Sequence, residues 1–472
     1  MEIRVYVIGA AGQVANVALT GFVLRGDITP APAAPAAKRK DLGTNLGHVR
    51  DFETDSPFLD KFKHARPWLT RAVGTVDVFD RQFSEQVPVD ADGWPTQVPF
   101  SPAGHPPQIV HTVLSTPRNG PHALLFEGKG KMVVKGPGVN APVTAAGGPG
   151  RWDVVINKRG NSYRDAATIY VEIHETDPAD PIRKLRFMHA GHVAVYETAP
   201  FEPLMIARLA GMTPIRFMDW GNTNRQPLAV WADRPKPSTY SQATNKGVAL
   251  EHMIALVNAT KADAWINVPH LANDAFVREM AKMLLAQLHP AGKVYVEYSN
   301  ETWNTEFDQG KYVSTESKVK YPGLRADLAH QKFATYKQVH VWELFKEVFG
   351  AQFEARIRRP LGGQAASGSV NKARLEYAEA SDVNPQGIKV QGLALAPYFG
   401  KVYRNSDVAG GIPTTAQLLQ DAKSDITQRR KWCVGFSEAT GQSDGCEAVG
   451  GRGRPDHPCG RVRAAREPGV RG

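Results

Sequence analysis

The sequence predicts an α/β protein built on a parallel β-sheet, with a smaller antiparallel β unit inserted into it. The sheet is predicted because short apolar segments of strand length alternate with longer segments of helical period between residues 205 and 400. Strands joined through a helix pair in parallel. The inserted unit is predicted because residues 100 to 195 consist of apolar segments broken by Gly, Asn and Asp, without a helical period.

The strands of the parallel sheet are expected where apolar segments are bounded by polar or turn residues. Each segment is too short for a helix of ordinary length, and each is separated from the next by a longer segment. In chain order they are LGTNL from residue 42, IRFMD at 215–219, AWINV at 264–268, KVYVEYS at 293–299, the segment that begins at Phe353, and VQGLALA at 390–396.

Two long helices are predicted between these strands. The first lies between the third and fourth strands, where Asn273 or Asp274 can cap its start and Pro290 follows its end. The second runs from about residue 329 to 349. Such repeated units give either an open, doubly wound sheet or a closed (β/α)8 barrel, and periodicity does not choose between them. The apolar face of the first helix is marked by Val277, Met280, Leu284 and Leu288.

The predicted organisation has five parts. Residues 1–40 form a leader with a Pro/Ala linker. The barrel-like part begins at 41–99, is interrupted at 100–195 by a β-sandwich-like domain and continues over 196–430. Residues 431–472 contain no Leu, Ile or Met, and they carry all three cysteines. So little apolar surface cannot offset chain entropy, so we expect a disordered or non-native tail, such as an out-of-frame read of a truncated chain.

Composition narrows the choice of partners and compartment. The net charge is +10, but Lys and Arg are dispersed and form no basic block interleaved with aromatics, so no nucleic-acid partner is expected. Residues 4–24 are interrupted by Gln13, Asn16 and Thr20, so no membrane anchor is expected. A weak leader indicates a secreted or periplasmic protein, and a cytoplasmic location stays open. The oligomeric state is unknown.

No cofactor or metal is expected. Gly9, Gly12 and Ala15 have the spacing of a dinucleotide-binding turn, the basis of a nucleotide-binding oxidoreductase hypothesis. A Rossmann unit would continue into a helix and a second strand, whereas prolines follow here, so a small-residue leader is favoured. The three cysteines include no C-x-x-C pair, which argues against a zinc site.

The candidate site lies at the end of the fourth predicted strand. Asn300 and Glu301 follow it directly, at the edge of a parallel sheet where active sites are built. A partly buried glutamate can act as a general acid towards a leaving oxygen, and an asparagine can hydrogen-bond a sugar hydroxyl. Aromatic side chains near strand ends are candidates for stacking on sugar rings: Trp220, Trp265, Tyr298, Trp303 and Tyr398.

Several of these residues have a structural alternative. A lone Trp most often packs in a core, and a lone Glu after a strand is most often a loop carboxylate. Glu297, within the strand, is expected to be an internal hydrogen-bond partner rather than the catalytic acid. His270 is either a substrate ligand or a structural histidine. Arg216 either braces a catalytic carboxylate, which we favour, or pairs with Asp219.

Four segments together carry a family resemblance: IRFMDWGNTN, AWINVPHLANDAFV, KVYVEYSNETWN and LALAPYFG. In this order they resemble bacterial proteins related to the clan A (β/α)8 glycoside hydrolases, some of which are labelled cellulose-binding. The resemblance covers about residues 42 to 400 and implies a TIM-type barrel. It implies an Asn-Glu acid/base at Asn300 and Glu301, and a tyrosine at the end of the sixth strand, matched by Tyr398. The implied activity is retaining hydrolysis of a β-linked polysaccharide.

The chain departs from this pattern after the sixth strand. Retaining hydrolases of the clan need a second glutamate at the end of the seventh strand as nucleophile. Only Glu438 is placed for that role, in a segment that does not read as a strand. We therefore expect the seventh and eighth strands to be lost or replaced and the enzyme to be impaired. The alternative is a non-catalytic protein that binds carbohydrate, such as a cellulose-like glycan.

Overall fold

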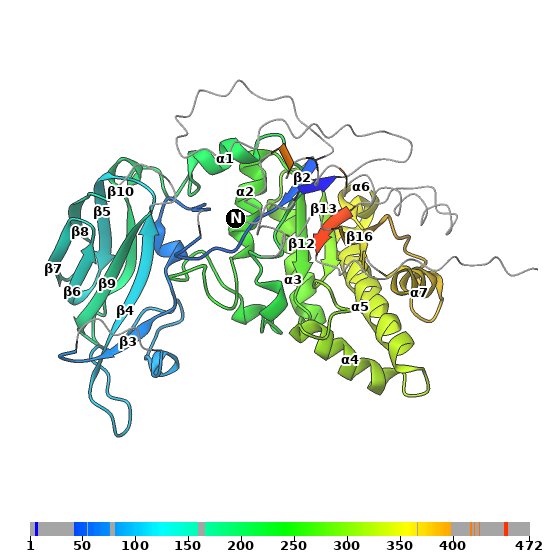
Figure 1. Ribbon diagram of the computed structural model, residues 1–472, viewed down its shortest axis with the longest axis horizontal. Coiled ribbons are helices and arrows are strands. Elements are labelled where there is room, and N and C mark those ends of the chain that lie inside the picture. Colours follow the sequence, from blue (N-terminus) through cyan, green and yellow to red (C-terminus); the bar gives the residue numbers. More distant parts are fainter. Residues whose placement is uncertain are drawn as a thin grey trace, which may run out of the picture.

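The computed structural model describes most of the chain between residues 42 and 397. It is a mixed α/β structure in which a mainly parallel sheet with helices stands beside two antiparallel sheets (Figure 1). The described residues are 5–7, 42–53, 55–75, 81–158, 166–365, 367–397, 416–417, 420, 424 and 448–451.

The parallel strands follow one another in chain order, as the sequence predicts, but the segment that begins at Phe353 starts as a short helix and forms strands only from Ile357 on. β2 pairs with β11, β11 with β12, β12 with β13 and β13 with β14, all in parallel, and β15 pairs in parallel with β16. Their bounds are β2 (Leu42–Asn45), β11 (Ile215–Arg216), β12 (Ala264–Val268), β13 (Val294–Tyr298), β14 (Ile357–Arg358), β15 (Pro360–Gly362) and β16 (Gly392–Pro397).

Two further strands stand between β16 and β2. β17 (Ala448–Gly451) pairs in parallel with β16, whereas β1 (Val5–Val7) is antiparallel to both β17 and β2. The strand order of this described sheet is β14-β13-β12-β11-β2-β1-β17-β16-β15, and its two end strands are separated in the chain by Arg359 alone. The sheet is therefore mixed, and it differs from the eight parallel strands that the resemblance implies.

Helices pack against one face of this sheet in the main core. The two helices that the sequence predicts are present as α3 and α5. The Asn273 side chain accepts a hydrogen bond from the Phe276 backbone N–H, so it caps α3 as the sequence predicts. No helix in the described part of the chain is long and apolar enough to cross a membrane. The helices are α1 (Pro203–Leu209), α2 (Leu250–Thr260), α3 (Asp274–Gln287), α4 (Asp308–Lys320), α5 (Ala326–Phe349), α6 (Phe353–Arg356) and α7 (Gly368–Glu379).

The strands alternate between two environments. Side chains of one parity, such as Ile266 and Val296, pack against the helices in the main hydrophobic core. Side chains of the other parity lie on the opposite face, and in β11 to β13 they are polar or aromatic. The sheet thus presents a polar network away from the helices. Its members on these strands are Arg216, Trp265, Asn267 and Glu297, and Tyr295 stacks on the Trp265 ring.

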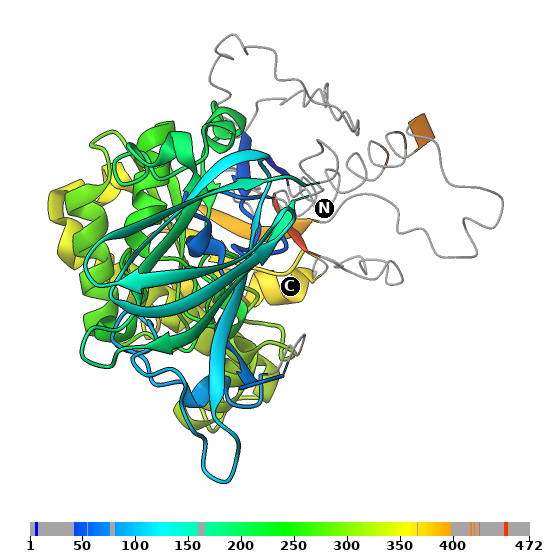
Figure 2. The ribbon, with the colours of Figure 1, turned by 90° about the vertical axis from the view of Figure 1, so that its left-hand side faces the viewer.

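The inserted unit is antiparallel, as predicted, and consists of two sheets of order β3-β4-β9-β6-β7 and β10-β5-β8. Their inner faces form a second core around Leu114, Leu124, Met132 and Phe187. Figure 2 views this unit from its own side, with the helices behind it. Its strands are β3 (Leu69–Ala72), β4 (Gln108–Thr116), β5 (Gly120–Glu127), β6 (Lys129–Gly136), β7 (Val139–Ala146), β8 (Gly150–Ile156), β9 (Ala167–Thr176) and β10 (Arg183–His189).

The unit begins earlier than residue 100. β3 pairs with β4, so a segment assigned to the barrel-like part belongs to the five-stranded sheet. The only helical element among the described residues of 43–68 is a 3-10 turn, η1 (Lys61–His64). Buried Lys61 pairs with Glu202 at 2.8 Å, which ties the start of the unit to the residue before α1.

Candidate functional site

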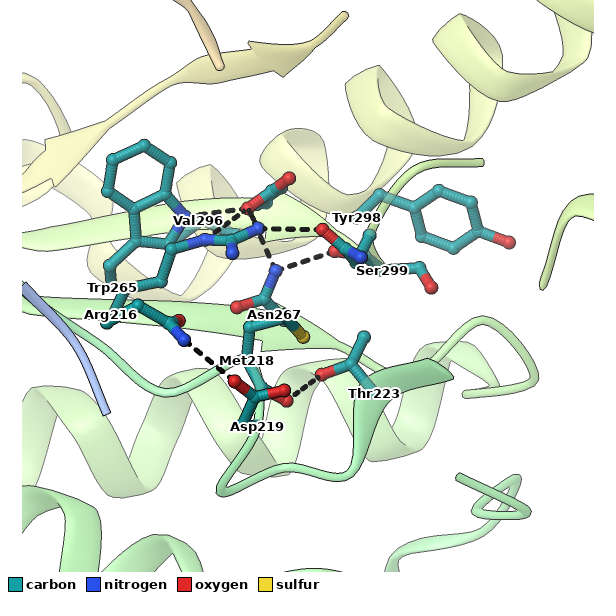
Figure 3. A network of polar contacts seen from close by, with 12 residues as sticks. Arg216, Met218, Asp219, Thr223, Trp265, Asn267, Val296, Tyr298 and Ser299 are labelled. Carbon is teal, nitrogen blue, oxygen red and sulfur yellow. Dashed lines mark hydrogen bonds and ion pairs between the residues drawn. The ribbon is translucent and has the colours of Figure 1, made fainter. Parts of the chain in front are cut away.

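The centre of the site is a buried carboxylate on β13. Oε2 of Glu297 accepts hydrogen bonds from Arg216 Nε at 3.1 Å and Nη2 at 2.7 Å, from Trp265 Nε1 at 2.8 Å and from Asn267 Nδ2 at 2.8 Å. The donors come from β11 and β12, and they converge in Figure 3. Glu297 is therefore an internal hydrogen-bond partner, as expected from its place within the strand.

A second buried guanidinium lies near this carboxylate. Arg374 of α7 donates to Thr302 Oγ1 at 3.0 Å, to Gln331 Oε1 at 2.8 Å and to the carbonyl of Gly362. Burial lowers the pKa of Arg374 to about 10, while the negative charge of Glu297 acts in the opposite direction. Glu297 thus balances cationic groups on two sides of the strand end.

The network continues to Asn300. Arg216 Nη2 donates to Asn300 Oδ1 at 3.0 Å, and Asn300 Nδ2 donates to Asn224 Oδ1 at 3.0 Å. Gln309 Nε2 donates to the same Asn224 oxygen at 2.7 Å and to the Asn300 carbonyl at 2.6 Å. Asn224 and Gln309 were missed by sequence reasoning, because a contact between a loop turn and a distant helix start leaves no periodic signal in the sequence.

The backbone around Asn300 is unusual. Ser299 has φ of 55° and Glu301 has φ of 41°, so both neighbours of Asn300 lie in the left-handed region that non-glycine residues rarely adopt. Asn267 Nδ2 donates to the Ser299 carbonyl at 2.6 Å, and Asn304 Nδ2 donates to Glu301 Oε2 at 3.2 Å. Left-handed residues held by such contacts cost about 1–3 kcal/mol each and cluster at functional sites.

A second carboxylate stands at the end of β11. Asp219 accepts a hydrogen bond from Asn45 Nδ2 at 2.9 Å, and its other oxygen lies 3.4 Å from His48 Nε2. Its side chain remains 12% exposed. Arg216 pairs with Glu297, which is an internal hydrogen-bond partner and not the expected catalytic acid. That Arg216 braces a catalytic carboxylate stays a prediction.

Two of the predicted aromatic residues are corrected by the structure. Trp220 is 2% exposed and packs among Phe58, Phe201 and Phe217, so its ring has no face for a sugar. Tyr298 has the parity of the helix-facing strand residues and lies in the main core. Burial raises its pKa well above the usual value.

His270 and Trp265 also have structural environments. Tyr298 donates its hydroxyl hydrogen to the His270 carbonyl at 3.0 Å, and the His270 ring meets Tyr312 edge-on. Burial lowers the pKa of His270, which favours the neutral ring. Trp265 stacks on Tyr295 and donates to Glu297, so it belongs to the interior of the site rather than to its open edge.

Of the remaining predicted residues, one is described and two are not. Trp303 is half-buried and donates from Nε1 to the Gly363 carbonyl at 3.1 Å. Tyr398 and Glu438 lie outside the described residues. Within the described ranges, no group of three or more His, Cys, Asp or Glu side chains could hold a metal ion.

Comparison with known proteins does not give a family. No protein-family model matches the chain, and no curated protein matches it in sequence. A ruminal GH26 endo-β-1,4-mannanase aligns over 71% of this chain and 79% of its own, with 9% identity and a TM-score of 0.20. A GH31 α-xylosidase from Xanthomonas citri aligns over 57% and 33%, with 9% identity and a TM-score of 0.14. TM-scores this low carry no argument about fold or function.

Proposed function

We propose that the protein is a glycoside hydrolase that cleaves a β-linked polysaccharide, with Glu301 as general acid and then general base. The observation that carries the proposal is the backbone conformation of the segment from Ser299 to Glu301. Two left-handed residues flank Asn300 at the carboxyl end of a parallel strand, and side chains from β11, β12 and α4 hold the segment in place. Strain maintained in this way is typical of a functional site.

The chemistry requires a proton donor beside the leaving oxygen. Glu301 is half-buried, and its Oε2 accepts a hydrogen bond from Asn304. A carboxyl group in this position can protonate the glycosidic oxygen as the bond breaks, and can then activate water. Asn300 would bind a sugar hydroxyl beside it, since its amide is already oriented by Arg216.

A second carboxylate completes the reaction. In a retaining enzyme it attacks the anomeric carbon and forms a glycosyl-enzyme, and the two carboxyl groups stand about 5–5.5 Å apart. Asp219 is the candidate on β11's side of the site, held by Asn45 and His48. Glu438 is the candidate that the resemblance implies.

The proposal is tested by incubating the purified chain with aryl β-glycosides and with soluble β-linked glucan, mannan and xylan. Release of the aglycone or of reducing ends is expected, and it should be lost in Glu301→Gln. Asp219→Asn and Glu438→Gln then identify the second carboxylate, because hydrolysis should be lost only in the variant that removes the nucleophile. Glycan binding without release of product would replace the proposal with a non-catalytic binding function. If the chain shows no glycan binding and releases no product, both functions are refuted.

A further inference from the structure

The loop after β11 supplies a second amide to the site, on Asn224. This half-buried residue lies in the 3-10 turn η4 (Thr223–Arg225). It is connected to the site through Asn300 and Gln309, which both donate to its Oδ1. The polarity of these hydrogen bonds determines which way the amide group of Asn224 faces.

The orientation follows from groups that have a fixed polarity. A guanidinium can only donate, so the Arg216 contact at 3.0 Å identifies the Asn300 atom as Oδ1 and leaves Nδ2 for Asn224. A backbone carbonyl can only accept, so the Asn300 carbonyl identifies the Gln309 atom as Nε2. Both neighbours therefore present N–H groups to Asn224, and its oxygen must face them. The nitrogen and oxygen atoms of the Asn300 and Gln309 amides, which are often hard to tell apart, are therefore both assigned by their partners.

The opposite end of the Asn224 amide is consequently a donor. None of the described residues accepts a hydrogen bond from Asn224 Nδ2, which keeps two N–H groups beside Asn300 and close in sequence to the end of β11. Asn300 Nδ2 has one further N–H after its bond to Asn224. Neutral, directional donors in this arrangement fit the lone pairs of hydroxyl or ether oxygens. The carboxylate of Glu301, next to Asn300 in the sequence, disfavours an anionic ligand.

We propose that Asn224 is a substrate-binding residue, which donates from Nδ2 to a neutral oxygen of the sugar ring that meets Glu301. This inference rests on the proposed function and adds a specificity-determining contact to the same site. Arg216, Asn300 and Gln309 position the donor, so its direction is set before the ligand arrives. Preorganisation of this kind reduces the entropy lost on binding.

The test variant is Asn224→Asp, which keeps an oxygen towards Asn300 and Gln309 but replaces the outward donor with an acceptor of similar size. The matched control is Asn222→Asp in the same loop, whose amide donates to the Asn245 carbonyl at 2.8 Å and not to the site. We expect N224D to lower kcat/KM for aryl β-glycosides, and affinity for β-linked hexasaccharides, on the order of tenfold. N222D should remain within about twofold of wild type, because the printed side-chain hydrogen bond of Asn222 goes to the Asn245 carbonyl and not to Asn300, Gln309 or Glu301.

Monodeoxy aryl β-glycosides provide a second readout that a purely structural role would not change. On the wild type, removal of one particular hydroxyl should cost about as much as the N224D change. On N224D the same deoxy substrate should lose nothing more, since the two partners form a single contact. If N224D does not fold by circular dichroism, Asn224→Ala tests the same loss of the donor.

The outcomes separate this inference from the proposed function. A wild type that hydrolyses or binds β-glycosides, together with a weakened N224D and coupling to one hydroxyl, supports it. Normal N224D kinetics, or equal deoxy losses in wild type and variant, would overturn the role of Asn224 and leave Glu301 unaffected. A wild type that neither binds nor hydrolyses any β-glycoside overturns both.

Discussion

Arg216 and Glu297 form a 2.7 Å ion pair across β12, and each side chain is only 5% exposed. The same guanidinium nitrogen also donates to Asn300, so one buried cation connects the interior of the sheet to the segment that carries Glu301. Burial makes such a pair expensive to break by removing one partner, because the other charge is left without compensation.

We therefore predict strong coupling between these two residues. Arg216→Met and Glu297→Leu should each lower the free energy of unfolding by about 3–5 kcal/mol, whereas the double variant should lose clearly less than the sum. Urea denaturation of the wild type, the two single variants and the double variant measures these free energies of unfolding. The exposed pair Lys282–Glu279 is the control, and its removal should cost less than about 1 kcal/mol. Additive losses for Arg216 and Glu297 would contradict the prediction.

The backbone at Ser299 allows a second prediction. Ser299 is fully buried with φ of 55°, a conformation that glycine adopts without the steric cost that a Cβ incurs. Ser299→Gly should therefore be about 1 kcal/mol more stable than Ser299→Ala. At Ser317, buried within α4, the order should reverse, because glycine is the poorer helix former. If alanine is more stable than glycine at Ser299 as well as at Ser317, Ser299 carries no strain of this kind.

The extent to which the sequence predicted this site depends on the kind of signal. β12 and α3 follow from apolar periodicity and a capping asparagine, and they agree with the structure. Tyr298 was misassigned because its parity, shared with Val294 and Val296, directs it to the helices. Trp220 follows its strand without a periodic context, so its burial depends on distant residues such as Phe58.

Long-range polar contacts lay beyond sequence reasoning altogether. Asn224 is 76 positions from Asn300 and 85 positions from Gln309 in the sequence, and it is hydrogen-bonded to both. Asn and Gln residues occur throughout the chain, and composition does not distinguish these two. β3 was not assigned to the antiparallel unit, because its partner β4 is separated from it in the sequence by a long connection.

Buried neutral histidines predict acid sensitivity. Burial lowers the pKa of His111 and His122 to about 4 and that of His252 to about 3, so the folded protein holds them neutral. The unfolded chain takes up protons below pH 6.5, and the folded state does so only near pH 3–4. Stability should therefore fall as pH decreases from about 6.5 towards 4, by on the order of 1 kcal/mol per histidine at pH 5.

Urea denaturation at pH 7, 6 and 5 measures this dependence. His122 has a direct test, because its Nε2 lies 3.0 Å from Thr116 Oγ1 and its Nδ1 lies 3.0 Å from the Gly120 carbonyl. His122→Gln removes the titrating ring, so the variant should show a smaller loss between pH 7 and 5 than the wild type. A free energy of unfolding that stays constant over this range would contradict the assignment of neutral buried rings.

The central claim, that Glu301 is the acid/base, is tested most directly by Glu301→Ala on aryl β-glycosides whose leaving groups differ in acidity. Loss of the acid should slow substrates with a poor leaving group by roughly 10²–10⁴-fold, and substrates with a dinitrophenolate leaving group far less, because that group departs without protonation. Added azide should restore turnover and yield a glycosyl azide. Equal rate losses for both substrates without azide rescue, or unchanged rates, would contradict the account.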